Sequence, residues 1–336
     1  MSLHAAEFQP PRWLRGGHLQ SVLSSSALRR RRARHAFALR GAVTREHLLD
    51  CRGVRLLGLH SAVPGRAPRG LVVLFHGWEG SAESGYMHAT AAALLGAGYE
   101  VFRLNFRDHG DTHHLNEDMF HSCRLDEVVD AVAEIERLFP TRPLLAAGFS
   151  LGGNFALRVA RAAPAAGIAL RHAVAVCPVL DPARGLVALE QAPPFYHWYF
   201  MRKWRQSLRR KQALFPERYV WDPRSLRQDM RALTASLAVG YAGLENLDAY
   251  LDGYCIAGDR LAGLEVPVSI LTAADDPVIP VEDFHRLVLP AHSRLEISNW
   301  GGHCGFIENA ALDGFAERWI AARLDAVVAA DETVAA

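Results

Sequence analysis

"GFSLGGN", residues 148–154, combines one serine with three glycines directly after the apolar run at 144–147. In a parallel sheet, a strand that turns at once into a helix lifts the turn residue above the edge where ligands bind. Glycines at positions 148 and 152 remove the Cβ atoms that would collide with the neighbouring strand and helix. The stretch therefore predicts a tight elbow that exposes the Ser150 hydroxyl, although a Gly-rich turn with a structural serine is the simpler alternative.

Short β-rich runs alternate with helical runs along most of the chain. The expected strands are 46–51, 54–60, 71–75, 99–105, 144–148, 173–177, 268–272 and 294–298, and clear helices are expected at 84–95 and 125–138. This alternation predicts an α/β fold, with a mostly parallel sheet flanked by helices.

The alternation stops between about 181 and 263. This stretch includes PPFYHWYFMRKWRQSLRRK at 193–211 and has helical periodicity without a convincing strand. It predicts a helical cap whose basic face meets water or, less simply, anionic headgroups. We expect four parts: an N-terminal arm at 1–40 packed on the core, an α/β core at 41–180 and 264–328, a helical cap insertion at 181–263 and a flexible tail at 329–336.

The charge balance and the cysteine content indicate which partners and which cellular compartment to expect. The 37 Lys and Arg residues nearly balance the 36 Asp and Glu residues, so no global charge favours nucleic acid or an anionic membrane. The run RRRRAR at 29–34 is a candidate polybasic arm for nucleic acid or acidic lipid, but a solvated loop is the simpler expectation. Five widely spaced cysteines without a C-x-x-C pair argue against a disulfide framework and favour a cytoplasmic location. No secretion signal or membrane span is expected, and the oligomeric state stays open.

A serine nucleophile needs a base, and the base needs a group that holds it. TAADDPVIP at 272–280 and NWGGHCGF at 299–306 each follow an expected strand, so their side chains should reach the same sheet edge as Ser150. The order Ser, Asp, His, each member just past a strand, is that of the α/β-hydrolase fold. Taken singly, the aspartate could merely cap a helix near Val281, and His303 could be an ordinary loop histidine.

The reaction also needs donors for the oxyanion. The backbone N–H of Leu151, directly after the nucleophile, is one candidate. HGWEG at 76–80 follows the expected strand 71–75 and offers the N–H of Trp78 as the second.

Several blocks together resemble the YheT-like branch of the α/β-hydrolase superfamily, which includes bacterial short-chain carboxylesterases and membrane-associated eukaryotic phospholipase relatives. The blocks are PPRWLRGGHLQSVLSS (10–25), LFHGWEGSAESGYM (74–87), LNFRDHGD (104–111), FHSCRLDEV (120–128), GFSLGGN, DDP (275–277) and GGHCGF (301–306). The resemblance implies a catalytic triad of Ser150, Asp276 and His303, with Trp78 and Leu151 lining the oxyanion hole.

The resemblance leaves some choices open. Asp276 is favoured as the acid because Pro-Val-Ile-Pro at 277–280 follows it, as is usual after the acid in this superfamily, and Asp275 is the alternative. Trp78 stands where the family often has Leu, and Cys123 where it often has Gly. These differences leave the acyl-chain preference undetermined.

Two further features could suggest other chemistry. RDHGDTHHLNEDMFH at 107–121 is rich in histidine, but its spacing matches no usual metal site, so we expect it to brace the triad or contact substrate. Cys304, beside His303, has no elbow to expose it and is expected to pack rather than react.

These patterns predict a serine hydrolase that cleaves carboxylic esters with short to medium acyl chains, or lipid-like esters, through an acyl-enzyme. The expected partner is a small-molecule ester or lipid, with weak membrane-surface contact left open, no nucleic acid, no metal and no cofactor. The alternatives are lipid hydrolysis or acyl transfer with a longer chain, and a catalytically silent binding module on the same fold.

Overall fold

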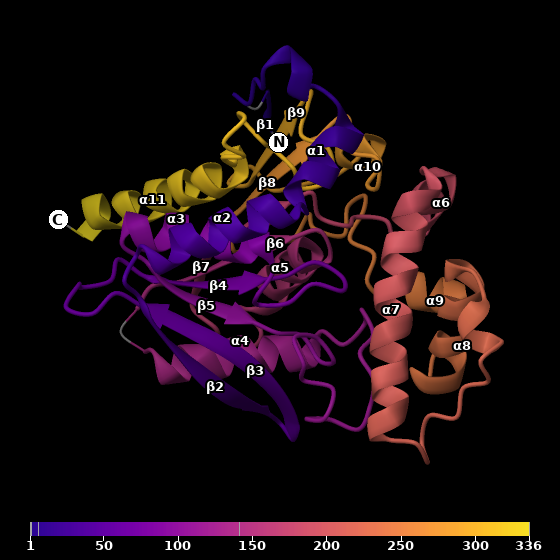
Figure 1. Cartoon of the computed structure of the whole chain (residues 1–336). Coiled ribbons are helices and arrows are strands. Elements are labelled where there is room, and N and C mark those ends of the chain that lie inside the picture. Colours follow the sequence, from indigo (N-terminus) through magenta and orange to yellow (C-terminus); the bar gives the residue numbers. More distant parts are fainter. Residues whose placement is uncertain (1, 6, 141, 336) are drawn as a thin grey trace.

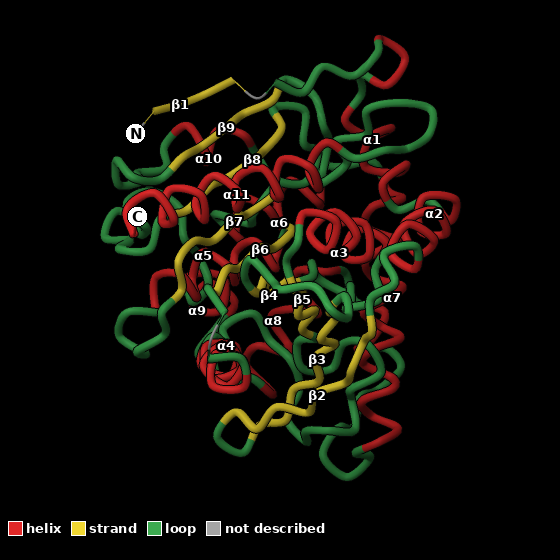
Figure 2. Tube along the Cα trace, turned by 90° about the vertical axis from the view of Figure 1, so that its left-hand side faces the viewer, coloured by secondary structure: helices red, strands yellow, loops and turns green. Residues whose placement is uncertain are grey.

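The computed structural model describes residues 2–5, 7–140 and 142–335 and contains a nine-stranded sheet in the order β1-β9-β8-β7-β6-β4-β5-β3-β2. Figure 2 shows this order from β1 at the top to β2 at the bottom. The strands are β1 (Ser2–Ala5), β2 (Val43–Cys51), β3 (Val54–Ala62), β4 (Leu71–Phe75), β5 (Glu100–Leu104), β6 (Leu144–Phe149), β7 (Leu170–Val176), β8 (Val268–Ala273) and β9 (Arg294–Ser298). All pairs are parallel except those of β3, which runs antiparallel to β2 and β5.

Helices cover both faces of the sheet, as the alternation in the sequence predicts. Side chains on β4 alternate between the two faces: Val73 packs with α4 (Asp126–Leu138) and α5 (Leu151–Ala162), whereas Val72 packs with α3 (Gly85–Ala97) and α11 (Phe315–Ala335). Every residue of β4 is buried because both faces are covered. Figure 1 shows α3 and α11 on the opposite side of the strands from α4.

The N-terminal segment adds to this core. It contains β1, η1 (Arg12–Leu14), α1 (Gly17–Ser24) and α2 (Ala27–Ala38), and β1 pairs with β9 at the edge of the sheet. The prediction of a solvated loop at 29–34 is wrong, because these residues lie in α2, which packs against α3. Ser26 caps this helix by accepting a hydrogen bond from the backbone N–H of Arg29.

Helices α6 (Pro182–Gln191), α7 (Pro194–Leu214), α8 (Met230–Tyr241) and α9 (Leu247–Asp252), with η2 (Ser225–Arg227), lie between β7 and β8 in the chain. They share an apolar cluster that includes Met201, Leu208 and Leu233. Figure 1 shows α6 to α9 gathered at one end of the sheet. The final short helix of the core, α10 (Val281–His285), follows β8.

The chain end is helical. The sequence predicts a flexible tail from 329, whereas α11 continues as a helix to Ala335, and residue 336 lies outside the described residues. The alanines that suggested a low-complexity tail are also the strongest helix formers, so the helix continues through them. None of the helices described, α11 included, has both the length and the apolar character needed to cross a bilayer.

Candidate active site

Ser150 sits at the turn between β6 and α5. Its backbone has φ 54° and ψ −118°, a left-handed conformation that is strained for a residue with a Cβ. A Cβ on Gly148 would collide with the carbonyl oxygen of Gly152, and one on Gly152 would collide with that of Phe75. Only glycine fits both positions, so the local sequence imposes the elbow that presents the Ser150 hydroxyl.

A line of hydrogen bonds joins Ser150, His303 and Asp276. His303 Nε2 lies 2.9 Å from Ser150 Oγ, and His303 Nδ1 lies 2.9 Å from Asp276 Oδ2. In the neutral ring, Nδ1 must carry the proton because a carboxylate only accepts hydrogen bonds, and the lone pair of Nε2 then faces the serine hydroxyl. Burial opposes protonation of the ring, but the carboxylate of Asp276 and the sulfur of Cys304 outweigh it and raise the pKa of His303 to about 9.

The two neighbouring aspartates have different partners. Asp276 Oδ1 accepts hydrogen bonds from the backbone N–H groups of Val278 and Ile279 at 2.8 and 3.0 Å, which fixes the carboxylate. Asp275 Oδ1 instead accepts one from the backbone N–H of Gly302 at 2.8 Å. The structure thus brings Asp276 to the imidazole, while Asp275 holds the loop that carries His303.

The predicted oxyanion donors lie beside the hydroxyl. Trp78, Leu151 and Ser150 line the same cavity. Within the described residues, neither the backbone N–H of Trp78 nor that of Leu151 donates a hydrogen bond to another part of the chain. Two unpaired N–H groups at this position can stabilise an oxygen that becomes negative next to Ser150.

The loop that carries Trp78 is held by buried polar groups. His76 Nε2 accepts a hydrogen bond from the backbone N–H of Phe106 at 3.2 Å, so its Nδ1 carries the proton and donates to Gly77 O at 2.8 Å. Burial lowers the pKa of His76, which keeps this ring neutral. The hydroxyl of Tyr86 accepts a hydrogen bond from the N–H of Gly77 at 2.8 Å. These three hydrogen bonds therefore fix the backbone directly before Trp78.

The N-terminal block at 10–25 contributes residues to the site that reasoning from the sequence missed. Ser21 Oγ accepts a hydrogen bond from the backbone N–H of His303 at 2.8 Å. Gln20 bonds Ile307 twice, with Oε1 accepting from its N–H at 2.6 Å and Nε2 donating to its carbonyl at 3.1 Å. The resemblance singled out this block, but its partner lies some 280 residues away in the chain, where no local pattern could indicate it.

A largely apolar cavity of about 140 Å³ lies between the elbow and helices α6 to α9. Trp78 forms part of its wall and stacks on Phe200 of α7 with ring centroids 5.4 Å apart. Leu186 and Leu237 contribute further apolar surface from α6 and α8. Such a cavity can hold an apolar group next to the serine.

A second cavity of about 150 Å³ also reaches Ser150 and His303. Its lining includes the side chains of Arg30 from α2 and Lys203 from α7. Within the described residues, neither cation forms an ion pair, and the Lys203 ammonium donates to the backbone carbonyl of Glu79 at 2.9 Å. A larger share of its lining is polar than in the first cavity, and we refer to it as the polar cavity.

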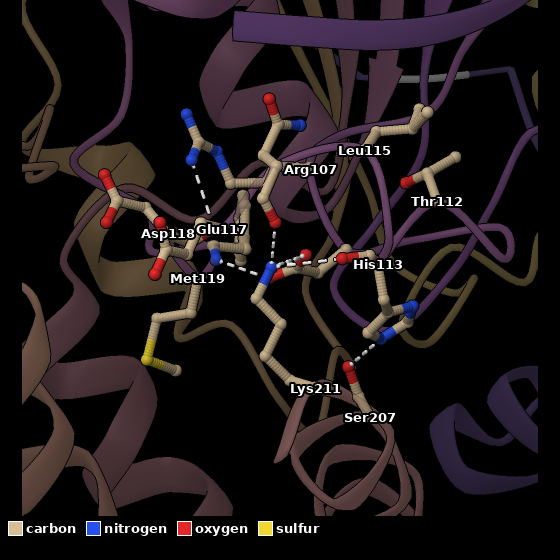
Figure 3. Close-up of polar contacts among 12 residues, drawn as sticks. Arg107, Thr112, His113, Leu115, Glu117, Asp118, Met119, Ser207 and Lys211 are labelled. Atoms are coloured by element: carbon tan, nitrogen blue, oxygen red, sulfur yellow. Dashed lines mark hydrogen bonds and ion pairs between the residues drawn. The ribbon is translucent and has the colours of Figure 1, made fainter. Parts of the chain in front are cut away.

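The His-rich loop at 107–121 is joined to α7 by a buried ion pair (Figure 3). Lys211 is 1% exposed, and its ammonium lies 2.8 Å from Asp108 Oδ1 and also donates to the carbonyl of Asn116. The prediction that the basic residues of this stretch face water is therefore wrong for Lys211. His113 Nε2 lies 2.8 Å from Ser207 Oγ, a second link between this loop and α7.

We expect Lys211→Met to lower the free energy of unfolding by about 3–5 kcal/mol, because it leaves the buried carboxylate of Asp108 without its cation. Urea denaturation followed by circular dichroism measures the change. Arg209→Met, on an exposed position of the same helix, is the matched control and should change stability by less than about 0.5 kcal/mol. If Lys211→Met and Arg209→Met lose the same free energy of unfolding, the ion pair between Lys211 and Asp108 does not stabilise the fold.

Comparison with known proteins places the chain in a family. The profile of the Hydrolase_4 family, described as serine aminopeptidase, S33, matches residues 66–309. The chain belongs to this family. It is also 27% identical over 265 residues to the Escherichia coli (strain K12) protein named "Putative esterase YheT", covering 75% of this chain and 74% of that protein. The resemblance to the YheT-like branch of the α/β-hydrolase superfamily is confirmed.

Solved structures show the same fold. The 2,6-dihydroxy-pseudo-oxynicotine hydrolase has a TM-score of 0.57 at 18% identity, with 86% of this chain and 69% of that chain covered. The Pyrococcus furiosus esterase Pf2001 has a TM-score of 0.54 at 15% identity, with 87% and 94% covered. A membrane phospholipase A, a bacterial virulence factor, has a TM-score of 0.55 at 19% identity, with 92% of each chain covered. These likenesses confirm the predicted α/β-hydrolase fold for this Hydrolase_4 member.

Proposed function

We propose that this Hydrolase_4 member cleaves carboxylic esters with Ser150 as the nucleophile, His303 as the general base and Asp276 as the group that orients the base. The hydrogen-bonded line from Ser150 Oγ through the imidazole to the Asp276 carboxylate is the observation that carries the proposal. The esterase name of its relative YheT supports the reaction class. No metal or cofactor enters the reaction.

The geometry supports the usual two-step course. His303 Nε2 takes the hydroxyl proton as Ser150 Oγ attacks the acyl carbon, and the N–H groups of Leu151 and Trp78 bind the oxyanion. The same imidazole then gives this proton to the leaving alcohol. A water molecule, deprotonated by His303, releases the acid and restores the serine.

We assign the acyl chain to the apolar cavity below α6 to α9 and the alcohol to the polar cavity near Arg30 and Lys203. Both cavities reach Ser150 and His303, so an ester spanning them would have its carbonyl at the hydroxyl. This arrangement supports a substrate with a short to medium or lipid-like acyl chain and a polar alcohol. Acyl transfer to a second alcohol would use the same groups.

Labelling with a fluorophosphonate probe tests the proposal, because the probe reacts only with an activated serine. We expect the folded wild-type protein to label at Ser150 and to hydrolyse p-nitrophenyl esters. A folded protein that neither labels nor hydrolyses any ester would instead support a catalytically silent binding module.

Filling the apolar cavity should change the acyl-chain preference. Leu237 of α8 lines this cavity, and we expect Leu237→Trp to lower the ratio of kcat/KM for p-nitrophenyl decanoate over acetate at least about tenfold. Val239→Trp, on an exposed position of the same helix, is the matched control. Equal losses on both esters would place the acyl chain elsewhere.

We also propose a weak contact with a membrane surface next to the polar cavity. Phe195 and Trp198 of α7 are 44% and 60% exposed, and Leu19 and Val22 of α1 are exposed as well. The ring of His18 lies 6.4 Å from that of Phe195, which places α1 beside α7. The guanidinium of Arg202 lies 5.3 Å from the centre of the Trp198 ring, and exposed aromatic side chains next to basic ones are typical of surfaces that lie on lipid.

We propose an arm at 1–40, a core at 41–180 and 264–328, and a cap at 181–263, a division that the apolar cluster shared by α6 to α9 supports. All five cysteines are free thiols, which supports a cytoplasmic location.

A further inference from the structure

Two cysteines lie next to the His303 imidazole, and the proposed ester hydrolysis uses neither of them. Cys177 follows β7 and is buried, whereas Cys304 follows His303 and lines the polar cavity. One donor atom each from Cys177, His303 and Cys304 lie within 4.8 Å of one another. Elsewhere in the described residues, no three His, Cys, Asp or Glu side chains converge in this way, including those of the 107–121 loop.

The backbone holds both thiols in place. Cys177 and Cys304 have φ values of 44° and 55°, left-handed conformations that residues with a Cβ seldom adopt. The N–H of Cys177 donates to Leu271 O at 2.8 Å, and the N–H of Cys304 lies 3.4 Å from Cys177 Sγ. The sulfur atoms also have backbone neighbours, because Cys177 Sγ lies 3.7 Å from Gly302 O and Cys304 Sγ lies 3.7 Å from Val176 O.

We propose that Cys177, Cys304 and His303 form a binding site for a zinc ion that inhibits the enzyme. Zinc prefers thiolate and imidazole ligands in a tetrahedron, with Zn–S near about 2.3 Å and Zn–N near about 2.0 Å. Ligand atoms of such a tetrahedron are roughly 3.5 Å apart, so donors within 4.8 Å of one another need only small movements. His303 and Cys304 line the polar cavity, through which water can reach the metal as a fourth ligand.

Zinc binding would stop ester hydrolysis because the metal occupies the His303 imidazole. Each thiol loses its proton to solvent when it binds zinc, and the metal takes a lone pair of the His303 ring. If Nε2 is the ligand, the ring can no longer accept the Ser150 proton; if Nδ1 is the ligand, the ring loses its bond to Asp276. The inhibition rests on the proposed function, whereas the metal site itself does not.

Cobalt(II) titration tests the site without any assay of activity, because thiolate ligands give cobalt a strong near-ultraviolet charge-transfer absorption. We expect the absorption at one equivalent in wild type and in Cys255→Ala, a control that removes a partly exposed cysteine outside the cluster. In Cys304→Ala the absorption should weaken, and zinc affinity by calorimetry should fall at least about tenfold. No absorption in wild type, or unchanged affinity in Cys304→Ala, would overturn the site.

Inhibition is measured on p-nitrophenyl acetate, with each variant compared to its own zinc-free rate. Zinc should inhibit wild type and Cys255→Ala, a chelator should restore both rates, and Cys304→Ala should need at least about tenfold more zinc. Tight zinc binding without inhibition would overturn the inhibitory role. A wild type that hydrolyses no ester would count against the proposed function alone, because the cobalt titration would still decide the metal site.

Discussion

Ser150→Ala is expected to lower kcat for a p-nitrophenyl ester by about six powers of ten. The variant removes the atom that forms the acyl-enzyme, and His303 Nε2, 2.9 Å from Ser150 Oγ in the wild type, loses the group that it deprotonates. The oxyanion N–H groups stay in place, so a residual rate about 10³-fold above that of the uncatalysed reaction should remain. Steady-state kinetics with circular dichroism as the folding check measure the effect.

Ser236→Ala is the matched control for this experiment. Ser236 is exposed on α8 and bonds only within its own region of the chain, so its loss should change kcat less than about twofold. The triad assignment fails if purified, folded Ser150→Ala keeps more than about one per cent of the wild-type rate.

Asp276→Asn should lower kcat by about 10⁴-fold because it changes which nitrogen of His303 carries the proton. Asp276 Oδ1 accepts hydrogen bonds from two backbone N–H groups, and in the variant only the amide oxygen can take this place. The amide NH₂ group then faces Nδ1, which must become an acceptor, so the proton moves to Nε2. An imidazole protonated at Nε2 cannot act as the base for Ser150.

Asp275→Asn provides an unusually close control, since it makes the same change at the adjacent residue. The amide oxygen can still accept the hydrogen bond that Asp275 receives from the N–H of Gly302, so we expect a loss of about tenfold or less. Rates from pre-steady-state bursts with both variants decide between the two acids. A larger loss in Asp275→Asn than in Asp276→Asn would reverse the assignment.

Much of this fold could be predicted because its signals are local. The alternation of β-rich and helical runs indicates a parallel sheet, and the glycines at 148 and 152 indicate the elbow, since both follow from sterics within a few residues. The order of Ser150, an aspartate and His303, each after a strand, also predicts that they share one sheet edge. The same local reasoning was wrong for the run at 29–34, where arginine favours helix as readily as loop.

Contacts between segments that are far apart in the chain could not be predicted from the sequence. Asp275 and Asp276 are adjacent and chemically identical, and only the relative placement of the loops after β8 and β9 turns one of them towards the imidazole. The burial of Lys211 against Asp108 likewise depends on how α7 docks on the core.

The residues alone thus determined the α/β architecture, the elbow and the chemical types gathered at one edge. The tertiary structure decided which aspartate meets His303, that Ser21 holds its loop and that Cys177 lies beside Cys304. The physical reason is range: backbone sterics act between neighbours in the chain, whereas these partnerships depend on the packing of segments that are far apart in the chain.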